Sequence, residues 1–184
     1  MYRAVAVKAA KLGINPKDED KVKTFIGDID LQIKYVDGAQ RTFLDGEDVS
    51  EKIREPQVSM MASDISALKC VRLKMVEMQR KIAESMSCVL DGRDIGSYVL
   101  PFANYKFYVT ADAKVRAERR YKELTEKGHK VDFDALYQEI EQRDYNDKHR
   151  DFAPLTQAKD AIYLDTSNMN VDEVISAILS YVKK

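Results

Sequence analysis

The chain has 184 residues, of which 45% are hydrophobic and 33% are charged, and its formal net charge is −1. This length is enough for one globular domain with a sizeable core. No block of like charges stands out, which argues against a polyanion-binding tail and against a membrane-binding basic patch. Any anion must therefore be bound by local clusters of arginine.

The cysteines and histidines indicate neither disulfides nor metal. Cys70 and Cys88 lie far apart in the chain, and His129 and His149 have no metal-ligand spacing. We therefore expect a reduced, cytoplasmic protein without a metal site built by its own side chains.

The N-terminal residues predict two helices. Residues 1–13 are rich in alanine and basic residues, which indicates an amphipathic helix that ends at Gly13. A transit peptide is the alternative, because no acidic residue precedes Asp18. Asn15, followed by proline, is typical of a helix start and predicts a short second helix toward Ile26.

A β-hairpin and a long helical region come next. Residues 29–35 alternate between apolar and polar, and the Asp37-Gly38 pair that follows is a strong hairpin signal. We expect the return strand to begin at residues 42–44, followed by a turn and an irregular stretch. Pro56 then starts a helical region to about Ser85, broken near Ala67. Its apolar face has helical spacing and consists of Val71, Met75, Met78 and Ile82.

The second half alternates short apolar runs with helical segments. The runs at 87–90, 106–109 and 161–164 predict buried strands, and the segments at 113–126, 133–149 and 171–182 predict helices. This rhythm indicates an α/β protein with a parallel sheet flanked by helices. Ligands of such sheets bind at the carboxyl ends of the strands.

The sequence VLDGRDIG, residues 89–96, follows the first of these predicted strands. The guanidinium of Arg93 is suited to grip a phosphate with two hydrogen bonds. The carboxylate of Asp94 is suited to accept from a base amine or a ribose hydroxyl, or to hold the arginine. An ordinary Asp-Gly turn is the alternative.

A second constellation lies in residues 140–150. Arg143, Asp147 and Arg150 are spaced i, i+4 and i+7 and therefore share one helix face. They indicate two arginines, steadied by a carboxylate, that face the charge of a transferring phosphoryl group. A solvated helix face with ordinary ion pairs is the alternative.

A third constellation crowds Arg116, Arg119 and Arg120 onto one side of a helix. Like charges at this spacing repel unless an anion or an acidic side chain offsets them. Glu118 and Glu123 are near enough in sequence to do so, which leaves ion pairing as the alternative to nucleotide binding.

Collinear motifs over essentially the whole chain resemble the bacterial cytidylate kinases, which are nucleoside monophosphate kinases. The motifs are MYRA (1–4), FLDGEDVSEKIRE (43–55), VRLKMVEMQR (71–80), VLDGRDIG (89–96), FYVTADAKVRAERR (107–120) and IEQRDYNDKHRDFAPL (140–155). The resemblance implies a P-loop NTPase-like parallel sheet flanked by helices, in one domain over residues 1–184. It also implies an inserted monophosphate-binding subdomain with a β-hairpin at about 15–67, and a lid region with its flanking helices at about 113–150.

The resemblance also implies a reaction and its partners. ATP with Mg²⁺ phosphorylates CMP or dCMP to CDP or dCDP, a step of pyrimidine nucleotide metabolism. The implied partners are these nucleotides, with no nucleic acid polymer and no membrane, and the implied state is a monomer.

Site residues follow from the matching motif positions. The implied CMP-binding residues are Arg3, Ser63, Arg72, Arg93, Asp94, Arg143 and Asp147. Among them, Ser63, Arg93 and Asp94 read the cytosine, whereas Arg3 and Arg143 hold the α-phosphate. The implied catalytic residues are Arg143, Asp147 and Arg150. The implied ATP-binding residues, in the lid, are Arg116, Arg119 and Arg120. The resemblance identifies no protein metal ligand in this chain.

One motif of the family has no counterpart in the 184 residues. The family begins with a strand and a G-x-x-x-x-G-K-[ST] loop, and neither is present in this sequence. We therefore expect an N-terminally truncated form with impaired ATP binding. Two alternatives are a non-catalytic CMP-binding or regulatory protein, and a structural or interaction module whose arginines only form ion pairs.

Overall fold

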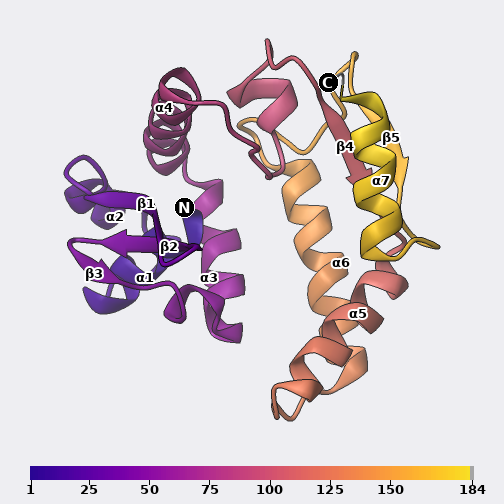
Figure 1. Cartoon of the computed structure of the whole chain (residues 1–184). Helices are drawn as coiled ribbons and strands as arrows, with labels where there is room; N and C mark the ends of the chain where they lie inside the picture. The colour runs from indigo at the N-terminus through magenta and orange to yellow at the C-terminus, as the bar shows by residue number, and fades with distance from the viewer. Residues whose placement is uncertain (183–184) are drawn as a thin grey trace. The chain divides into compact units, whose positions relative to one another are not determined.

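The computed structural model describes residues 1–182, which form two compact units, residues 1–89 and residues 90–182 (Figure 1). Each unit combines helices with a small sheet, which confirms the α/β class. The first unit has an antiparallel sheet of three strands, and the second has a parallel pair of strands.

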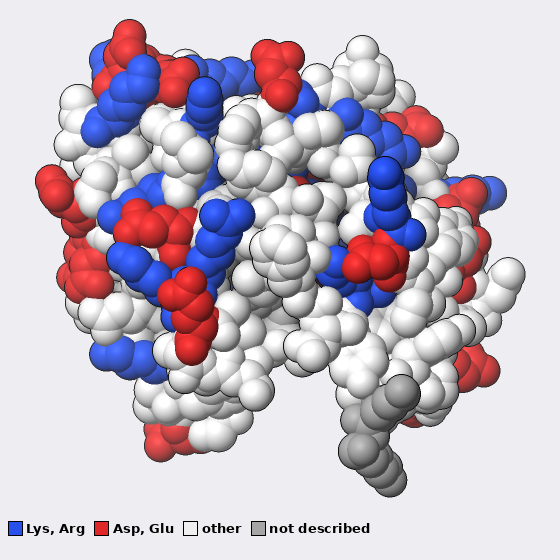
Figure 2. Space-filling view, turned by 90° about the horizontal axis from the view of Figure 1, so that it is seen from above, with Lys and Arg blue, Asp and Glu red and all other residues white. Residues whose placement is uncertain are grey.

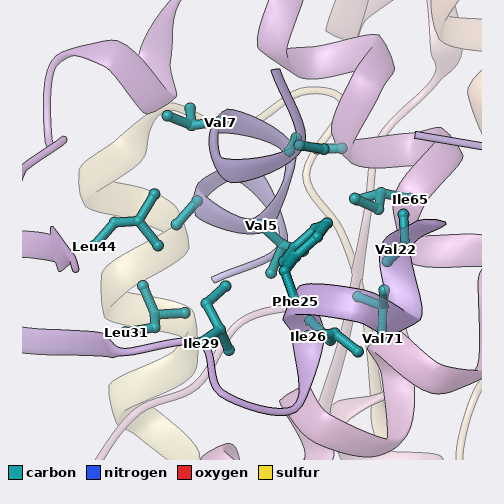
Figure 3. Close-up of a cluster of buried hydrophobic side chains, with 14 of the residues drawn as sticks. Val5, Val7, Val22, Phe25, Ile26, Ile29, Leu31, Leu44, Ile65 and Val71 are labelled. Atoms are coloured by element: carbon teal, nitrogen blue, oxygen red, sulfur yellow. The ribbon is translucent and has the colours of Figure 1, made fainter. Parts of the chain in front are cut away.

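The first unit has four helices around one apolar core. They are α1 (Tyr2–Lys11), α2 (Glu19–Ile26), α3 (Pro56–Ala67) and α4 (Lys69–Ser85), with a short 3₁₀ turn, η1 (Lys52–Arg54), before α3. Side chains from all four helices and the first two strands converge in this core (Figure 3). Val5, Val22, Leu44 and Ile65 have no accessible surface there. Burial of such side chains is the main favourable term in the stability of this unit.

Two tight turns shape the sheet of the first unit. Strands β1 (Leu31–Val36) and β2 (Ala39–Leu44) pair antiparallel, and the short β3 (Glu47–Asp48) pairs with β2. Both residues of the Asp37-Gly38 turn have positive φ, 51° and 76°, as a type I′ hairpin turn requires. The expected hairpin is therefore confirmed, although its return strand begins at Ala39, directly after the turn, and not at residues 42–44. The second turn, Asp45-Gly46, repeats this geometry and turns part of the expected irregular stretch into another hairpin.

The expected helix start at Asn15 is wrong. Helix α2 begins at Glu19 and is capped by Asp18, whose side chain accepts from the amide of Lys21. Asn15 instead opens a turn, because its backbone carbonyl accepts from the amide of Asp18 at 2.9 Å. Proline fixes a backbone angle that suits the second position of such a turn as well as the first turn of a helix.

The helical region 56–85 is confirmed, with its break one residue after Ala67. Leu68 is extended, with φ −71° and ψ 126°, and separates α3 from α4. Val71 and Met75 are fully buried against the core, and Met78 packs against it in part. The predicted apolar face is thus confirmed for Val71, Met75 and Met78, whereas Ile82 is half-buried and lies outside this core.

The second unit contains the parallel sheet and three of the expected helices. Its elements are the π-helical turn η2 (Ile95–Val99), β4 (Phe107–Thr110), α5 (Ala113–Glu126), α6 (Phe133–His149), β5 (Ile162–Asp165) and α7 (Val171–Tyr181). Strands β4 and β5 pair in parallel from Phe107 opposite Ile162 to Thr110 opposite Asp165. Helices α5 and α6 form an antiparallel helical hairpin (Figure 1).

The expected strand at residues 87–90 is wrong. These residues have no regular secondary structure, and Val89 is 99% exposed. A strand requires a partner that accepts its backbone hydrogen bonds, and no strand of residues 1–182 pairs with this segment. An apolar run indicates only that its side chains favour burial, and it does not show whether another strand is available to pair with it.

The charged surface agrees with the balanced composition. Basic and acidic side chains are interspersed over the face drawn in Figure 2, and no broad area there has a single sign. Within residues 1–182, no helix combines the length and the apolar character that a membrane crossing would need.

Candidate functional site

The candidate site in the second unit is built around the carboxylate of Asp147. Helix α6 places this residue in its last turn, with its side chain only 6% exposed. One carboxylate oxygen accepts from Nε of Arg93 at 2.9 Å and lies 4.0 Å from Nε of Arg143. The other lies 3.5 Å from Nη1 of Arg150. The predicted helix face is confirmed for Arg143 and Asp147 but is wrong for Arg150, which follows the end of α6 and reaches the same carboxylate from an extended backbone. Arg93 approaches this carboxylate from outside the helix.

Arg150 is held on three sides. It follows the last residue of α6 and has an extended backbone. Its Nε donates to the carbonyl of Ala153 at 2.7 Å, and its Nη2 lies 3.5 Å from Asp94. Ala153 has a φ of 48°, an uncommon conformation for a residue other than glycine, and its carbonyl oxygen accepts from the guanidinium. The amide of Leu155 donates back to the carbonyl of Asp147 at 2.8 Å.

Asp94 connects this cluster to the DGRDIG motif. Because the strand before the motif does not form, Asp94 does not follow a strand; it precedes the π-helical turn η2. Its carbonyl accepts from the amides of Tyr98 and Val99 at 2.9 and 3.1 Å. Its side chain is 4% exposed, and the ion pair with Arg150 places two expected site residues in direct contact.

The cluster has an excess of positive charge. Its ionised side chains are three arginines and two aspartates: Arg93, Arg143, Arg150, Asp94 and Asp147. Burial and then repulsion by Arg93 lower the pKa of Arg143. An anion with several oxygens would relieve this repulsion, and guanidinium groups suit phosphate because they donate in pairs. The arrangement therefore favours binding of a phosphate group.

The first unit contains the other expected substrate residues. Arg3, in the first turn of α1, donates to the carbonyl of Ile53 at 2.9 Å and to Oγ of Ser59 at 3.2 Å. Arg72 is 1% exposed, donates to the carbonyl of Ser66 at 3.2 Å and lies over the ring of Tyr2.

A stripe of serines on α3 links these arginines, and sequence reasoning found only one of its members. Ser59, Ser63 and Ser66 are spaced i, i+4 and i+7 and share a helix face. The backbone carbonyl of the buried Ser63 accepts from Oγ of Ser66 at 2.9 Å. The stripe was visible in the sequence as a helical period of small polar residues.

The three arginines of α5, expected near ATP, each contact a different protein group. Arg116 forms a two-point ion pair with Asp144 of α6. Arg119 donates to the backbone carbonyls of residues 166, 167 and 169 in the loop after β5, and Arg120 pairs with Glu123 at 2.7 Å. Glu123 was foreseen as a partner, whereas Asp144 was not.

Among residues 1–182, no group of three or more His, Cys, Asp or Glu side chains is arranged to hold a metal ion.

Comparisons with known proteins identify the family. Residues 1–184 match the family described as cytidylate kinase. The chain is 48% identical over 184 residues to a cytidylate kinase of Caldicellulosiruptor bescii, covering 100% of this chain and 81% of the relative. It is 42% identical over 183 residues to one of Leuconostoc mesenteroides, covering 100% and 82%.

The α/β fold, with a small parallel sheet flanked by helices, is compatible with the nucleotide kinases as a class. The chain belongs to the cytidylate kinase family.

Proposed function

We propose that the chain transfers the γ-phosphoryl group of ATP to CMP or dCMP, giving ADP and CDP or dCDP. The observation that carries this proposal is the cluster of three arginines around Asp147, in a chain whose relatives are named cytidylate kinases. A cytoplasmic location and a monomeric state belong to the same proposal. They rest on the cysteine usage and on the resemblance, respectively.

Individual roles follow from the resemblance and the contacts together. Ser63, Arg93 and Asp94 read the cytosine base. Arg3 and Arg143 hold the α-phosphate. The remaining CMP-binding roles belong to Arg72 and Asp147. Arg119 and Arg120 contact ATP when the lid region closes and excludes water. Mg²⁺ would reach the reaction with ATP, because proteins commonly hold it through substrate phosphates.

In this reaction a phosphate oxygen of CMP bonds to the γ-phosphorus while the bond to the β–γ bridging oxygen breaks. Negative charge then spreads over the equatorial oxygens of the transferring group. Arg143 and Arg150 provide the opposing positive charge. Arg150 is already fixed by Ala153, Asp147 and Asp94, so it needs little reorganisation during the reaction. Asp147 keeps the two guanidinium groups close despite their repulsion.

The experiment that tests this proposal is a coupled ADP-release assay with ATP and each of CMP, dCMP, UMP and AMP. We expect turnover with CMP or dCMP and much less with the other two. Calorimetry with CMP separates the alternatives, because saturable binding without product would indicate a non-catalytic binding protein. No binding and no product would contradict the proposal and favour an interaction module.

Two variants sharpen the substrate assignment. Arg93→Ala should abolish measurable CMP binding at substrate concentrations that saturate the wild type. Asp94→Asn should narrow the preference for CMP over UMP, because a neutral amide cannot replace both acceptor oxygens of a carboxylate. Unchanged discrimination between CMP and UMP would contradict a role of Asp94 in reading the base.

A further inference from the structure

The helical hairpin of α5 and α6 is closed at one end by an ion pair. Nη1 and Nη2 of Arg116 donate to the two carboxylate oxygens of Asp144, at 3.1 and 2.5 Å. The two side chains are 34% and 25% exposed, so this contact is partly shielded from water. A guanidinium that meets a carboxylate at two points fixes orientation as well as distance.

Arg116 also ties the hairpin to the sheet. Its Nε donates to the carbonyl of Ala111 at 3.0 Å, one residue beyond the end of β4. The guanidinium of one residue of α5 therefore contacts both the end of a strand and a second helix. Arg119, nearly one turn later, binds the loop that follows β5. The start of α5 is thus anchored at the carboxyl ends of both strands.

The partner of Arg116 is adjacent in sequence to the phosphate-binding face of α6. Successive helical residues point about 100° apart, because a turn contains 3.6 residues. Asp144 therefore contacts Arg116 of α5, whereas Asp147 contacts Arg93 on another side of the helix. Any rotation of α6 about its own axis would break the Arg116 contact and would also move Asp147 away from Arg93, which approaches from outside the helix.

Apolar packing holds the rest of the hairpin but specifies this rotation less strictly. Ala117 and Leu124 of α5 and Leu136 of α6 are buried, and the rings of Tyr121 and Phe133 meet edge to face at 5.7 Å. Apolar contacts are not directional, so helices packed in this way tolerate small rotations. The ion pair at the other end supplies the directional contact.

We propose that Asp144 is a positioning residue for phosphoryl transfer, which acts through Arg116 to fix the rotation of α6 and thereby the placement of Arg143 and Asp147. This inference rests on the proposed function. It gives Arg116 a structural task at the hairpin that differs from a direct contact with ATP.

The test compares Asp144→Asn, Arg116→Lys and the double variant in the same phosphorylation assay, with CMP binding measured by calorimetry. Misplacing a catalytic group slightly costs about tenfold to a hundredfold in rate, so we expect turnover to fall by that factor in each single variant. The KM for ATP should change less than about twofold, since neither residue then binds ATP. The double variant should be no slower than the worse single variant, because both substitutions remove one contact.

Two further variants guard the interpretation. Asp144→Glu keeps a carboxylate with two oxygens and should recover most of the turnover that Asp144→Asn loses. Asp134→Asn removes an exposed carboxylate from the first turn of the same helix and should leave turnover unchanged. If Asp144→Asn does not fold, Arg116→Lys still tests the positioning role, because lysine keeps the positive charge but cannot form the two-point contact.

The outcomes separate the two proposals. A wild-type chain that neither binds nor phosphorylates CMP contradicts the proposed function, and the positioning role falls with it. An active wild type with normal turnover in Asp144→Asn overturns the positioning role alone. A raised KM for ATP in Arg116→Lys but not in Asp144→Asn also overturns it, and indicates that Arg116 binds ATP directly.

Discussion

The carboxylate of Asp147 accepts a hydrogen bond from Nε of Arg93 at 2.9 Å, although the two residues are 54 positions apart in the sequence. The same carboxylate is approached by Arg143 and Arg150. One buried anion therefore holds three cations together, and its removal should affect both the stability of the second unit and its chemistry.

Asp147→Ala should destabilise the protein strongly. The substitution leaves three guanidinium groups close together without their shared carboxylate, and breaking a buried ion pair in this way typically costs about 3–5 kcal/mol. We expect less than that, about 2–3 kcal/mol, because Arg93 is 42% exposed and water can solvate it. Urea denaturation monitored by circular dichroism measures the loss. Asp147→Asn should lose less, because its amide oxygen still accepts from Arg93. Equal stability of wild type and Asp147→Ala would show that the contacts contribute nothing.

Arg143→Ala and Arg150→Ala should differ in stability but not in kinetics. Loss of one group that stabilises transition-state charge commonly costs about a hundredfold to a thousandfold, so turnover should fall that far in both. Arg150 is 6% exposed and contacts Ala153, Asp147 and Asp94, whereas Arg143 is 30% exposed. Only Arg150→Ala should therefore lower the free energy of unfolding, by about 2 kcal/mol. Parallel kinetic and urea measurements on both variants check this. A similar stability loss in the two variants would contradict the distinction.

Most of the helices and the first hairpin could be predicted from local sequence patterns. Helices α5, α6 and α7 match their expected ranges closely, because helical spacing and capping residues are properties of neighbouring residues. The hairpin at Asp37-Gly38 was equally local. The prediction of a strand at residues 87–90 was wrong because strand pairing is not local: it depends on a partner strand elsewhere in the chain. The Asn15-Pro16 signal failed because a turn and a helix start share the same backbone preferences.

The candidate site was predictable only in part for related reasons. The common face of Arg143 and Asp147 followed from helical spacing, but no spacing rule joins Arg93 to Asp147. Asp144 was missed because a charged residue next to other charged residues on a helix normally faces solvent. Only the tertiary contact with Arg116 distinguishes it from such a residue.

Two glycines without close neighbours allow the effect of backbone conformation on stability to be distinguished from the effect of side-chain packing. Gly38 has a φ of +76°, Gly27 has a φ of −61°, and an added Cβ would meet nothing within 4 Å at either position. Gly38→Ala should therefore cost about 1 kcal/mol, the penalty of a left-handed conformation for alanine. Gly27→Ala should be neutral or slightly stabilising, because alanine adopts helical angles readily. Thermal unfolding of both variants beside the wild type makes the comparison. An equal loss in both would refute the conformational explanation.

Glu123 should give α5 a pH-dependent contribution to stability. Hydrogen bonds from Lys127 and then Arg120 lower the pKa of Glu123 from 4.5 to about 2. A carboxylate whose pKa is lower in the folded state stabilises the protein above the unfolded pKa. That contribution is lost as the pH falls from about 4.5 to about 2. Since the side chain is 46% exposed, the contribution at neutral pH should stay below about 1 kcal/mol and shrink with added salt.

The measurement for Glu123 is the difference in thermal midpoint between wild type and Glu123→Gln across this pH range. The wild type should be the more stable at pH 7, and the difference should vanish as the pH approaches 2. Glu126→Gln is the matched control on the same helix, because Glu126 meets Lys122 only at 3.9 Å with both side chains largely exposed. Its midpoint should follow the wild type at every pH. A difference between wild type and Glu123→Gln that persists at pH 2 would show that Glu123 acts through packing, since its ion pairs are lost once its carboxylate is protonated.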